Sequence, residues 1–298
     1  MDPLLRTTIR RLDGLAHRRE ILAAGCSRRT LDDAWRSGAV QRIRHGLYGS
    51  PDLPEQVVRA ARVGGALAGA SALASRGAWS PPDEQLVVSV PHNARDLRDP
   101  DDAGRRLAPG GGDVLVLRDG TDLSSGERAI VSPSRAAAQA LTHLEPDLAV
   151  AVVDSALRLS APDRPHRSAV ETLLRGRRAR HLVTLLDARA ESGTESVVRM
   201  RLLQAGIEAE IQVWVSDRHR VDLLVDGWLV VECTSYGFHG SPQQYENDRR
   251  RITDLTGLGY VVTEVTYHQA FQEWPAVLAA LQRLLRDARP ARLPRRPR

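Results

Sequence analysis

One segment, residues 220–233, constrains the fold of this chain more than any other. It reads RVDLLVDGWLVVEC: two apolar runs of strand type joined by Asp226-Gly227, a strong signal for a β-hairpin turn. Each run contains one acid, Asp222 in the first and Glu232 in the second. Burying a carboxylate in an apolar strand is costly unless the carboxylate is paired or bound to a metal. The hairpin therefore predicts a sheet that carries a polar site.

The register of the hairpin decides whether these two acids can meet. With a plain two-residue turn, Asp222 would oppose Val231, and Glu232 would point to the other face of the sheet. A three-residue loop or one bulge would instead bring Asp222 opposite Glu232. A site shared by the two acids thus predicts an irregularity between Asp226 and Trp228.

Helices and strands expected around the hairpin define a C-terminal domain over residues 191–285. They are a helix over 192–203 that ends at Gly206, strands at 211–216, 220–225 and 228–233, a helix near 243–257, a strand at 260–265 and a helix near 270–285. The order αβββαβ followed by a last helix predicts an α/β core.

Three acids of this domain suit a Mg²⁺ or Mn²⁺ site that hydrolyses phosphodiesters. Such a site needs hard oxygen ligands on fixed strands, which Asp222 and Glu232 supply, while Glu195 would orient ligands or water. Two alternatives need no metal. Ser192-x-x-Glu195 is also a capping box, in which Glu195 binds the Ser192 amide, and Asp222 could pair with Arg220 or Arg201.

The first 52 residues predict a winged helix-turn-helix domain. A first helix is expected from Asp13 to Ala23, closed by Gly25. Ser27 then caps a second helix, which buries Leu31, Ala34 and Trp35 and ends at Gly38. Residues 40–50 are expected to form a hairpin with His45-Gly46 at its turn.

This order of elements predicts contact with DNA. The start of the second helix would enter the major groove with Arg28, Arg29 and Thr30, and the wing would bring Arg42 and Arg44 to the backbone or minor groove. The alternative is a helical hairpin with a solvated charged face, in which Asp32 and Asp33 pair with the arginines.

Both ends of the chain are basic, and the expected C-terminal domain is acidic. The net charge is +5, and all 42 basic residues are arginines, so Walker loops, Schiff-base enzymes and protein kinases are excluded in their usual forms. Residues 1–50 contain ten arginines and five acids, and the basic tail 286–298 contains six arginines and one acid. Residues 191–285 contain eight arginines and thirteen acids. A polyanion is the partner that such ends favour.

Residues 53–190 predict a mixed α/β middle region without a catalytic constellation. Helix is expected at 55–76, strand at 86–90 and 113–119, a loop at 91–112, and helices over 132–190 with breaks near Pro146 and at 161–166. This region would connect, pack or dimerise. The two cysteines are far apart in the sequence, and no apolar run approaches the roughly 18 residues that a membrane helix requires. We therefore expect a soluble, cytoplasmic protein without membrane contact.

Two parts of the sequence resemble known families. The stretches SGTESVVRMRLLQAGI, RVDLLVDGWLVVECTSYGFHGSPQQYENDRRR and LGYVVTEVTY resemble a PD-(D/E)XK-type domain of unknown function related to very-short-patch repair endonucleases, and hence a restriction-endonuclease-like core. The segment LAAGCSRRTLDDAWRSGAVQRIRHGLYGSPD resembles the winged-helix domain of AbiEi-like type IV antitoxins.

The first resemblance assigns roles to several residues. It implies that Glu195, Asp222 and Glu232 are the acidic set of a nuclease core, His239 the histidine after the third strand, and Asp248 with Arg249 the acid and base of the next helix. Thr234 stands where the general nuclease motif has lysine. Either Thr234 and His239 form a working variant, with His239 acting on the attacking water, or the domain has lost catalysis.

Two functions follow as expectations. The main one is a DNA-binding, Mg²⁺-dependent endonuclease. The alternative is a non-catalytic, antitoxin-like transcriptional regulator whose C-terminal domain dimerises or captures a cognate toxin of the nucleotidyltransferase type.

Overall fold

The computed structural model describes residues 1–82, 85–110, 112–120, 127–234, 242–291 and 293–294. The chain divides into two compact units, one formed by residues 1–140 with 159–176 and the other by residues 141–158 with 177–298. Each unit is described by itself below.

The first unit begins with a small module of three helices and a three-stranded antiparallel sheet. Its elements are α1 (Pro3–Arg11), β1 (Leu15–His17), α2 (Arg18–Ala23), α3 (Arg28–Arg36), β2 (Gln41–Arg44) and β3 (Leu47–Gly49), with the strands in the order β1-β3-β2. Leu5, Ile21 and Leu31, one from each helix, are fully buried in its core. The hairpin turns at His45-Gly46, and the order of elements agrees with the expected winged helix.

Two expectations for this module are wrong. The helix expected from Asp13 starts only at Arg18, because Asp13 and Gly14 both have positive φ and the next three residues pair with β3. Trp35, expected in the buried stripe of α3, is 43% exposed. Helical spacing alone cannot tell a core position from one beside the wing, which here covers part of that face.

The rest of the first unit places helices around a small sheet. Its elements are α4 (Glu55–Val63), β4 (Ala66–Leu67), α5 (Gly69–Ala74), β5 (Leu86–Val90), β6 (Val114–Arg118), most of α6 (Pro133–His143) and α8 (Arg167–Leu173). β5 and β6 confirm the strands expected at 86–90 and 113–119. The strands lie in the order β4-β5-β6, with β5 and β6 parallel. The helix expected over 55–76 is broken at Gly64, which has a φ of 127°, and at Gly65, where a Cβ would lie 2.1 Å from the carbonyl oxygen of Ser89.

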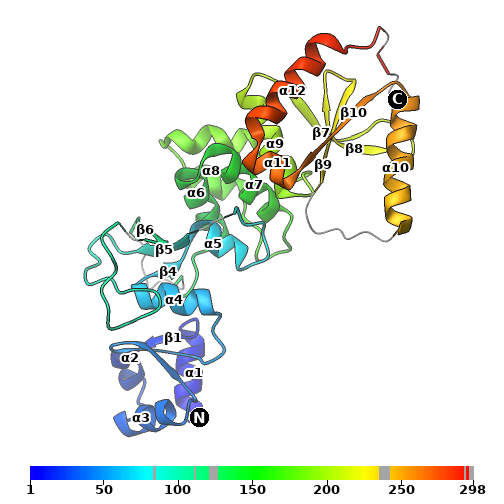
Figure 1. The fold of residues 1–298 in the computed structure, drawn as a ribbon. Coiled ribbons are helices and arrows are strands. Elements are labelled where there is room, and N and C mark those ends of the chain that lie inside the picture. Colours follow the sequence, from blue (N-terminus) through cyan, green and yellow to red (C-terminus); the bar gives the residue numbers. More distant parts are fainter. Residues whose placement is uncertain (83–84, 111, 121–126, 235–241, 292, 295–298) are drawn as a thin grey trace. The chain divides into compact units, whose positions relative to one another are not determined.

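The second unit contains a four-stranded sheet between helices. Its elements are α7 (Pro146–Leu157), the 3₁₀ helix η1 (Arg178–Leu185), α9 (Gly193–Gln204), β7 (Ala209–Trp214), β8 (Arg220–Val225), β9 (Leu229–Thr234), α10 (Pro242–Gly257), β10 (Val261–Thr266), α11 (Tyr267–Gln272) and α12 (Trp274–Asp287). The strands lie in the order β10-β9-β8-β7, with only β9 and β10 parallel (Figure 1). The expected order of helices and strands is found, except that the last helix is divided at Glu273.

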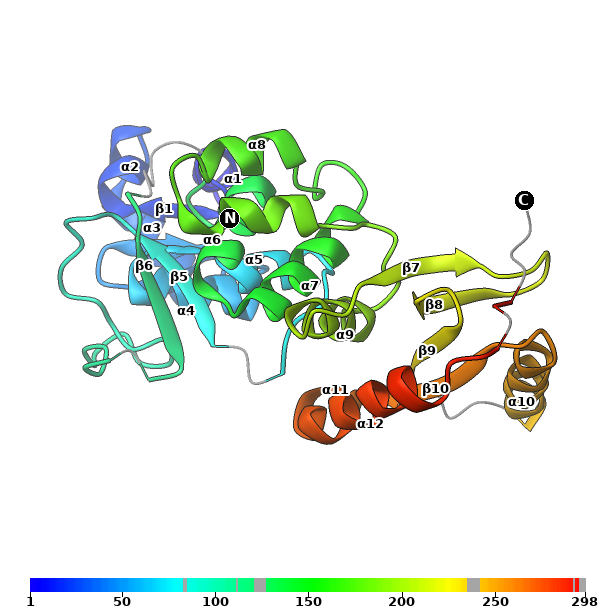
Figure 2. The same cartoon turned by 90° about the horizontal axis from the view of Figure 1, so that it is seen from above.

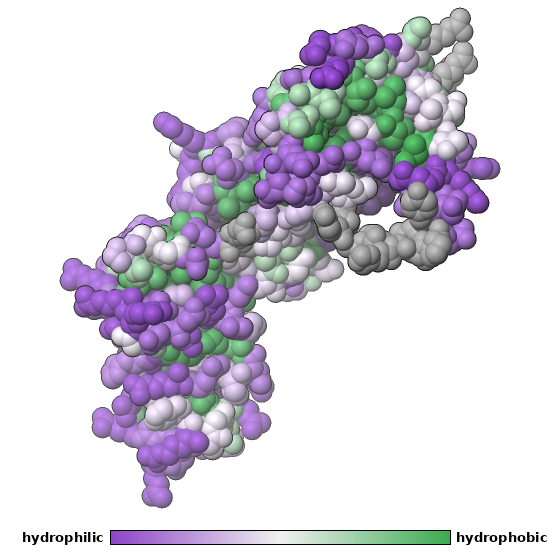
Figure 3. All heavy atoms as spheres, in the orientation of Figure 1, coloured by the Kyte–Doolittle hydropathy of each residue, from purple (hydrophilic) through white to green (hydrophobic). Residues whose placement is uncertain are grey.

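Each face of this sheet has its own apolar core. On one face Leu223, Val231 and Val265 pack with residues of α9 and α12. On the other, Leu224 and Val230 pack with Leu255 of α10. In the view of Figure 3, hydrophobic residues reach the surface over the sheet, between α12 and α10. The two cores hold β8 and β9 firmly, so that polar groups on these strands have fixed positions.

Candidate functional site

The turn between β8 and β9 contains three residues, Asp226 to Trp228. Leu223 pairs with Val231 and Val225 with Leu229, and both Asp226 and Gly227 have positive φ. This is the irregularity that a shared carboxylate site predicts, and the expectation is confirmed. The next step of the same register brings Asp222 opposite Glu232.

At Asp222 the regular ladder between β8 and β9 ends. The carboxylate of Asp222 takes over the role of a main-chain acceptor: its Oδ2 accepts a hydrogen bond of 2.8 Å from the N–H of Cys233. In Figure 2 the pair β7–β8 diverges from the pair β9–β10. The site therefore lies at a fork in the sheet, where side chains reach between two strands.

Gln212 joins Asp222 to Glu195. Its Nε2 donates to Glu195 Oε2 at 2.8 Å and to Asp222 Oδ1 at 3.2 Å, and its main chain has a φ of 53° within β7. Gln212 is not among the site residues predicted from the sequence. A signal was present, because Gln212 is a polar residue inside an apolar strand, as Asp222 and Glu232 are.

Glu195 is buried at the start of α9, with 3% of its surface exposed. Its amide donates to Ser192 Oγ at 3.2 Å, but its carboxylate accepts from the amide of Glu191, at 2.9 Å, and not from that of Ser192. The capping-box alternative is thus only half right, because the carboxylate is turned toward the preceding residue and toward Gln212.

The alternative ion pairs of Asp222 are not formed. Arg201 binds Asp147, with 2.6 Å between Nε and Oδ2, and Arg220 pairs with Glu191. Asp222 interacts instead with neutral donors and with the carboxyl group of Glu232.

The fork carries more acid than base. Burial and the charge of Asp222 together raise the pKa of Glu232 to about 8, although Arg251 acts in the opposite direction. Burial and the charge of Asp222 also raise the pKa of Glu195. A bound cation would lower both pKa values again, because it would favour the charged form of each carboxyl group.

Arg251 on α10 is the basic residue that contacts this cluster. Its Nη2 lies 2.8 Å from Glu232 Oε1 and also donates to the carbonyl of Arg220. The resemblance pointed to Arg249 and Asp248 instead. Arg249 pairs with Glu264 of β10 at 3.1 Å, and Asp248 is exposed on α10.

The remaining candidate residues lie at the edge of the cluster or outside it. Thr234 is exposed at the last position of β9, paired with Thr266 of β10. His239 lies outside the described residues. Within the described parts of the chain, no three His, Cys, Asp or Glu side chains are grouped closely enough to hold a metal ion. Asp222 and Glu232 fit a divalent cation in donor type and charge, and Gln212 links Glu195 to them.

The N-terminal module presents a second candidate site at the start of α3. Ser27 Oγ accepts from the amide of Thr30 at 3.0 Å, which fixes the first turn of the helix. Arg28 and Arg29 are exposed there. Arg29 has only a long contact of 3.9 Å with Asp33, and its side chain is 92% exposed. The predicted pairing with Asp33 thus exists, but a contact of this kind stabilises by less than about 1 kcal/mol.

The two wing arginines differ in their surroundings. Arg42 is exposed, lies over the ring of Trp35 at 5.6 Å and contacts His45 at the tip of the wing. Arg44 is half-buried, and a Cβ on Gly64 would lie 2.8 Å from its Nη1. Burial lowers the pKa of Arg44. The structure therefore places Arg42 beside α3 and packs Arg44 against the start of the middle region.

Two comparisons show which known proteins this chain resembles. Residues 3–51 match the family model described as transcriptional regulator, AbiEi antitoxin. The uncharacterized proteins MT2308 and Rv2248, from Mycobacterium tuberculosis strains CDC 1551 / Oshkosh and ATCC 25618 / H37Rv, are each 28% identical over 282 residues, which is 89% of this chain and 99% of each relative. No helix among the described residues is long and apolar enough to cross a membrane. Over residues 3–51, which include α3 and the wing, this chain is similar to the AbiEi antitoxin family of transcriptional regulators.

Proposed function

We propose that this protein is a DNA-binding transcriptional regulator of the AbiEi antitoxin type. The observation that carries the proposal is the match of residues 3–51 to that family, on a module whose α3 begins with two exposed arginines. A helix N-terminus that enters the major groove brings its first residues to base edges and phosphates. Arg28, Arg29 and Thr30 would make these contacts, and Arg42 would bind the backbone from the wing.

The electrostatics of the module favour this role. Residues 1–50 contain ten arginines and only five acids. Asp33 forms exposed ion pairs with Arg29, at 3.9 Å, and with Arg36, at 3.5 Å. Such weak pairs are readily exchanged for phosphate contacts, which release counterions from DNA.

Fluorescence anisotropy with labelled duplexes from the region upstream of the protein's own gene tests this proposal. We expect binding that weakens steeply with salt, and that is weakened further when Arg28 and Arg29 are both changed to alanine. Arg175→Ala is the matched control, because Arg175 is an exposed arginine of the same unit outside the module. Equal binding of DNA by the double variant and this control would refute the proposal that α3 contacts DNA.

The proposed regulator type implies a protein partner as well as DNA. A cognate toxin of the nucleotidyltransferase type is the expected partner, and a homodimer would match two half-sites on the DNA. Co-expression with the product of an adjacent nucleotidyltransferase gene, followed by size-exclusion chromatography, tests the partner. Separate elution of the two proteins would count against it.

A second candidate function is metal-dependent hydrolysis of DNA at the fork between β8 and β9. Two observations support it. The three-residue turn pairs Leu223 with Val231, a register in which the next residues are Asp222 and Glu232. Gln212 also links Asp222 to Glu195. A Mg²⁺ ion, when bound, would supply a Lewis acid and an activated water. Asp222 and Glu232 would hold it, and Glu195 would orient water.

In this candidate function, Arg251 takes over a role that lysine usually has. The position two residues after Glu232 is Thr234, which can donate a hydrogen bond but carries no charge. Arg251, at 2.8 Å from Glu232, is the cation closest to the acids and would bind a phosphate oxygen that approaches them.

Cleavage assays with duplex, nicked and mismatched DNA in Mg²⁺ or Mn²⁺ test this candidate. Glu232→Ala should abolish cleavage and calorimetric Mn²⁺ binding. Glu264→Ala should retain both, because Glu264 lies next to Glu232 on β10 but binds Arg249. DNA binding without metal-dependent cleavage of any substrate would leave the regulator as the function of the chain.

A further inference from the structure

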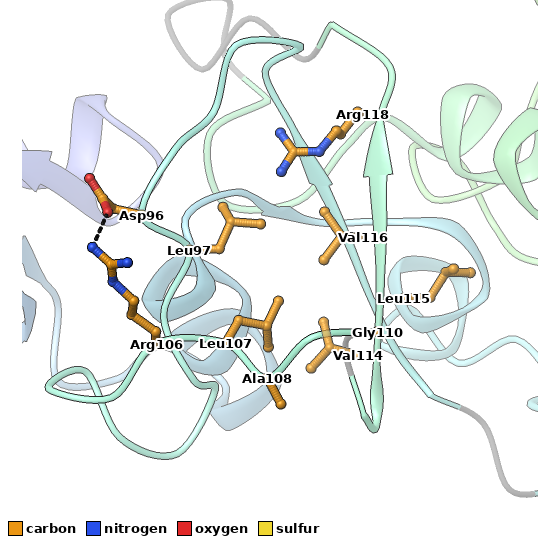
Figure 4. Close-up of a pocket in the computed structure, with 10 residues that line it drawn as sticks. All are labelled: Asp96, Leu97, Arg106, Leu107, Ala108, Gly110, Val114, Leu115, Val116 and Arg118. Carbon is orange, nitrogen blue, oxygen red and sulfur yellow. Dashed lines mark hydrogen bonds and ion pairs between the residues drawn. The ribbon is translucent and has the colours of Figure 1, made fainter.

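A hollow of about 520 Å³ opens beside β6 in the first unit (Figure 4). The loop between β5 and β6 forms one wall and β6 forms the other. Six of its ten lining residues are aliphatic: Leu97, Leu107, Ala108, Val114, Leu115 and Val116. In Figure 4, Leu97 and Leu107 face Val114 and Val116 across the hollow.

The size and lining suit an aliphatic ligand. Small-molecule sites usually have volumes of about 300–1,000 Å³ and are mostly apolar. No aromatic residue is among those that line this hollow, so a nucleobase or another flat ring would find no stacking partner. An aliphatic chain would instead remove the leucine and valine side chains from water, which is favourable in proportion to the area covered.

One end of the hollow carries the positive charge of Arg118. Arg118 is exposed, and its Nη1 donates to the carbonyl of Ala94 at 2.8 Å. It forms no ion pair within the described part of the chain. The neighbouring acid Asp119 is engaged by Ser89, Gln139 and Arg135.

The other charges at the hollow cancel each other. Asp96 and Arg106 form an ion pair of 3.2 Å at the rim (Figure 4). Arg118 therefore gives the hollow a net positive charge at one end, beside its six aliphatic residues. This combination recognises a molecule with an anionic head and an aliphatic chain.

We propose that this hollow binds an amphiphilic carboxylate, with its head on Arg118 and its chain between Leu107 and Val116. Two remaining guanidinium nitrogens of Arg118 can form a bidentate contact with a carboxylate. This site is independent of DNA binding and of the carboxylate fork, and its test uses neither activity.

Isothermal titration calorimetry with decanoate, below the concentration at which it forms micelles, tests the proposal. We expect saturable binding to the full chain, and octanoate should bind about tenfold more weakly because two fewer methylenes are buried. Decyltrimethylammonium has the same chain length and the opposite charge, and it should not bind measurably.

Two variants and one control locate the binding. Arg118→Gln and Val116→Phe should each weaken decanoate binding at least tenfold, the first by removing the charge and the second by filling the hollow. Arg95→Gln should bind as the unaltered protein does, because Arg95 is an exposed arginine of the same loop that does not line the hollow. Thermal unfolding of each variant checks that it is folded. We expect Arg118→Gln to fold, because it changes only an exposed side chain.

Three results would overturn the proposal: no binding of decanoate, equal binding of the cationic amphiphile, or unchanged binding by Arg118→Gln. Weakening by Arg95→Gln equal to that by Arg118→Gln would also overturn it, because the attraction would then be general and not specific to the hollow.

Discussion

Asp222 on β8 accepts a hydrogen bond of 2.8 Å from the main-chain N–H of Cys233 on β9, where a regular ladder would provide a carbonyl oxygen. The carboxylate thus has a structural role that is separate from any chemistry. It satisfies an amide that the divergence of the two strands would otherwise leave without an acceptor.

Changing Asp222 to alanine should lower the free energy of unfolding by about 1–3 kcal/mol, because the amide of Cys233 loses its acceptor. Asp222→Asn keeps a side-chain oxygen for this amide but turns an NH2 group toward Gln212 Nε2, so it should lose less stability than the alanine variant. Urea unfolding of both variants measures this difference. A loss of stability in the asparagine variant as large as in the alanine variant would show that the charge, and not the hydrogen bond, matters.

Two neighbouring arginines of α10 form a matched pair for a second prediction. Arg251→Gln should lower the free energy of unfolding by about 1–3 kcal/mol, because it leaves the nearly buried carboxyl group of Glu232 without its cationic partner. Arg249→Gln removes a pair with Glu264 in which both side chains are more than one third exposed, and it should change stability by less than about 1 kcal/mol. Urea unfolding of the two variants at one pH measures both losses of unfolding free energy. Equal losses would contradict the expectation that the pair with the more buried Glu232 contributes more.

Asp154 predicts a specific dependence of stability on pH. Its fully buried carboxylate on α7 binds Arg199 at 3.1 Å and accepts from Ser196 Oγ and the amide of Asp187. Burial nevertheless raises the pKa of Asp154 to about 6. A raised folded-state pKa gives stability that is fully present below the unfolded value of 3.8 and is lost as the pH rises through about 6.

The test compares the free energy of urea unfolding of the unaltered protein with that of Asp154→Asn between pH 4 and pH 7. The asparagine variant lacks this titration, so the difference between the two proteins should change by about 3 kcal/mol over this range, with the unaltered protein losing stability toward pH 7. A difference that does not vary with pH would mean that Arg199 compensates fully for burial.

Salt dependence gives a quantitative prediction for the proposed DNA contacts. If Arg28 and Arg29 each neutralise one phosphate, changing both to alanine should reduce the slope of log K against log salt by about 2. Anisotropy titrations between low and moderate salt measure the slope. An unchanged slope with weaker binding would assign these arginines to base edges instead of phosphates.

Much of the local structure of the second unit follows from its sequence. Apolar runs predicted β7 to β10, because a strand that packs between two helical layers places apolar side chains on both of its faces. The acids within those strands marked the candidate site, since unpaired carboxylates are rarely tolerated there. The match over residues 3–51 likewise agrees with the family resemblance that the N-terminal segment carries.

Other features depended on contacts between residues far apart in the chain. Leu15–His17 looks helical alone, but it pairs with Leu47–Gly49 as a strand. Trp35 has the spacing of a core residue, yet the wing places Arg42 over its exposed ring. Neither outcome follows from local spacing, because hydrophobic periodicity records a preferred face without stating what covers it.

The sequence by itself determined the order of helices and strands in the second unit, the acids at the candidate site and the condition under which they could meet. Only the tertiary structure decided that the condition is fulfilled, through the three-residue turn, and that Gln212 and Arg251 complete the cluster. The physical reason is that strand register and helix docking are fixed by the packing of both faces of the sheet together, whereas sequence patterns describe one element at a time.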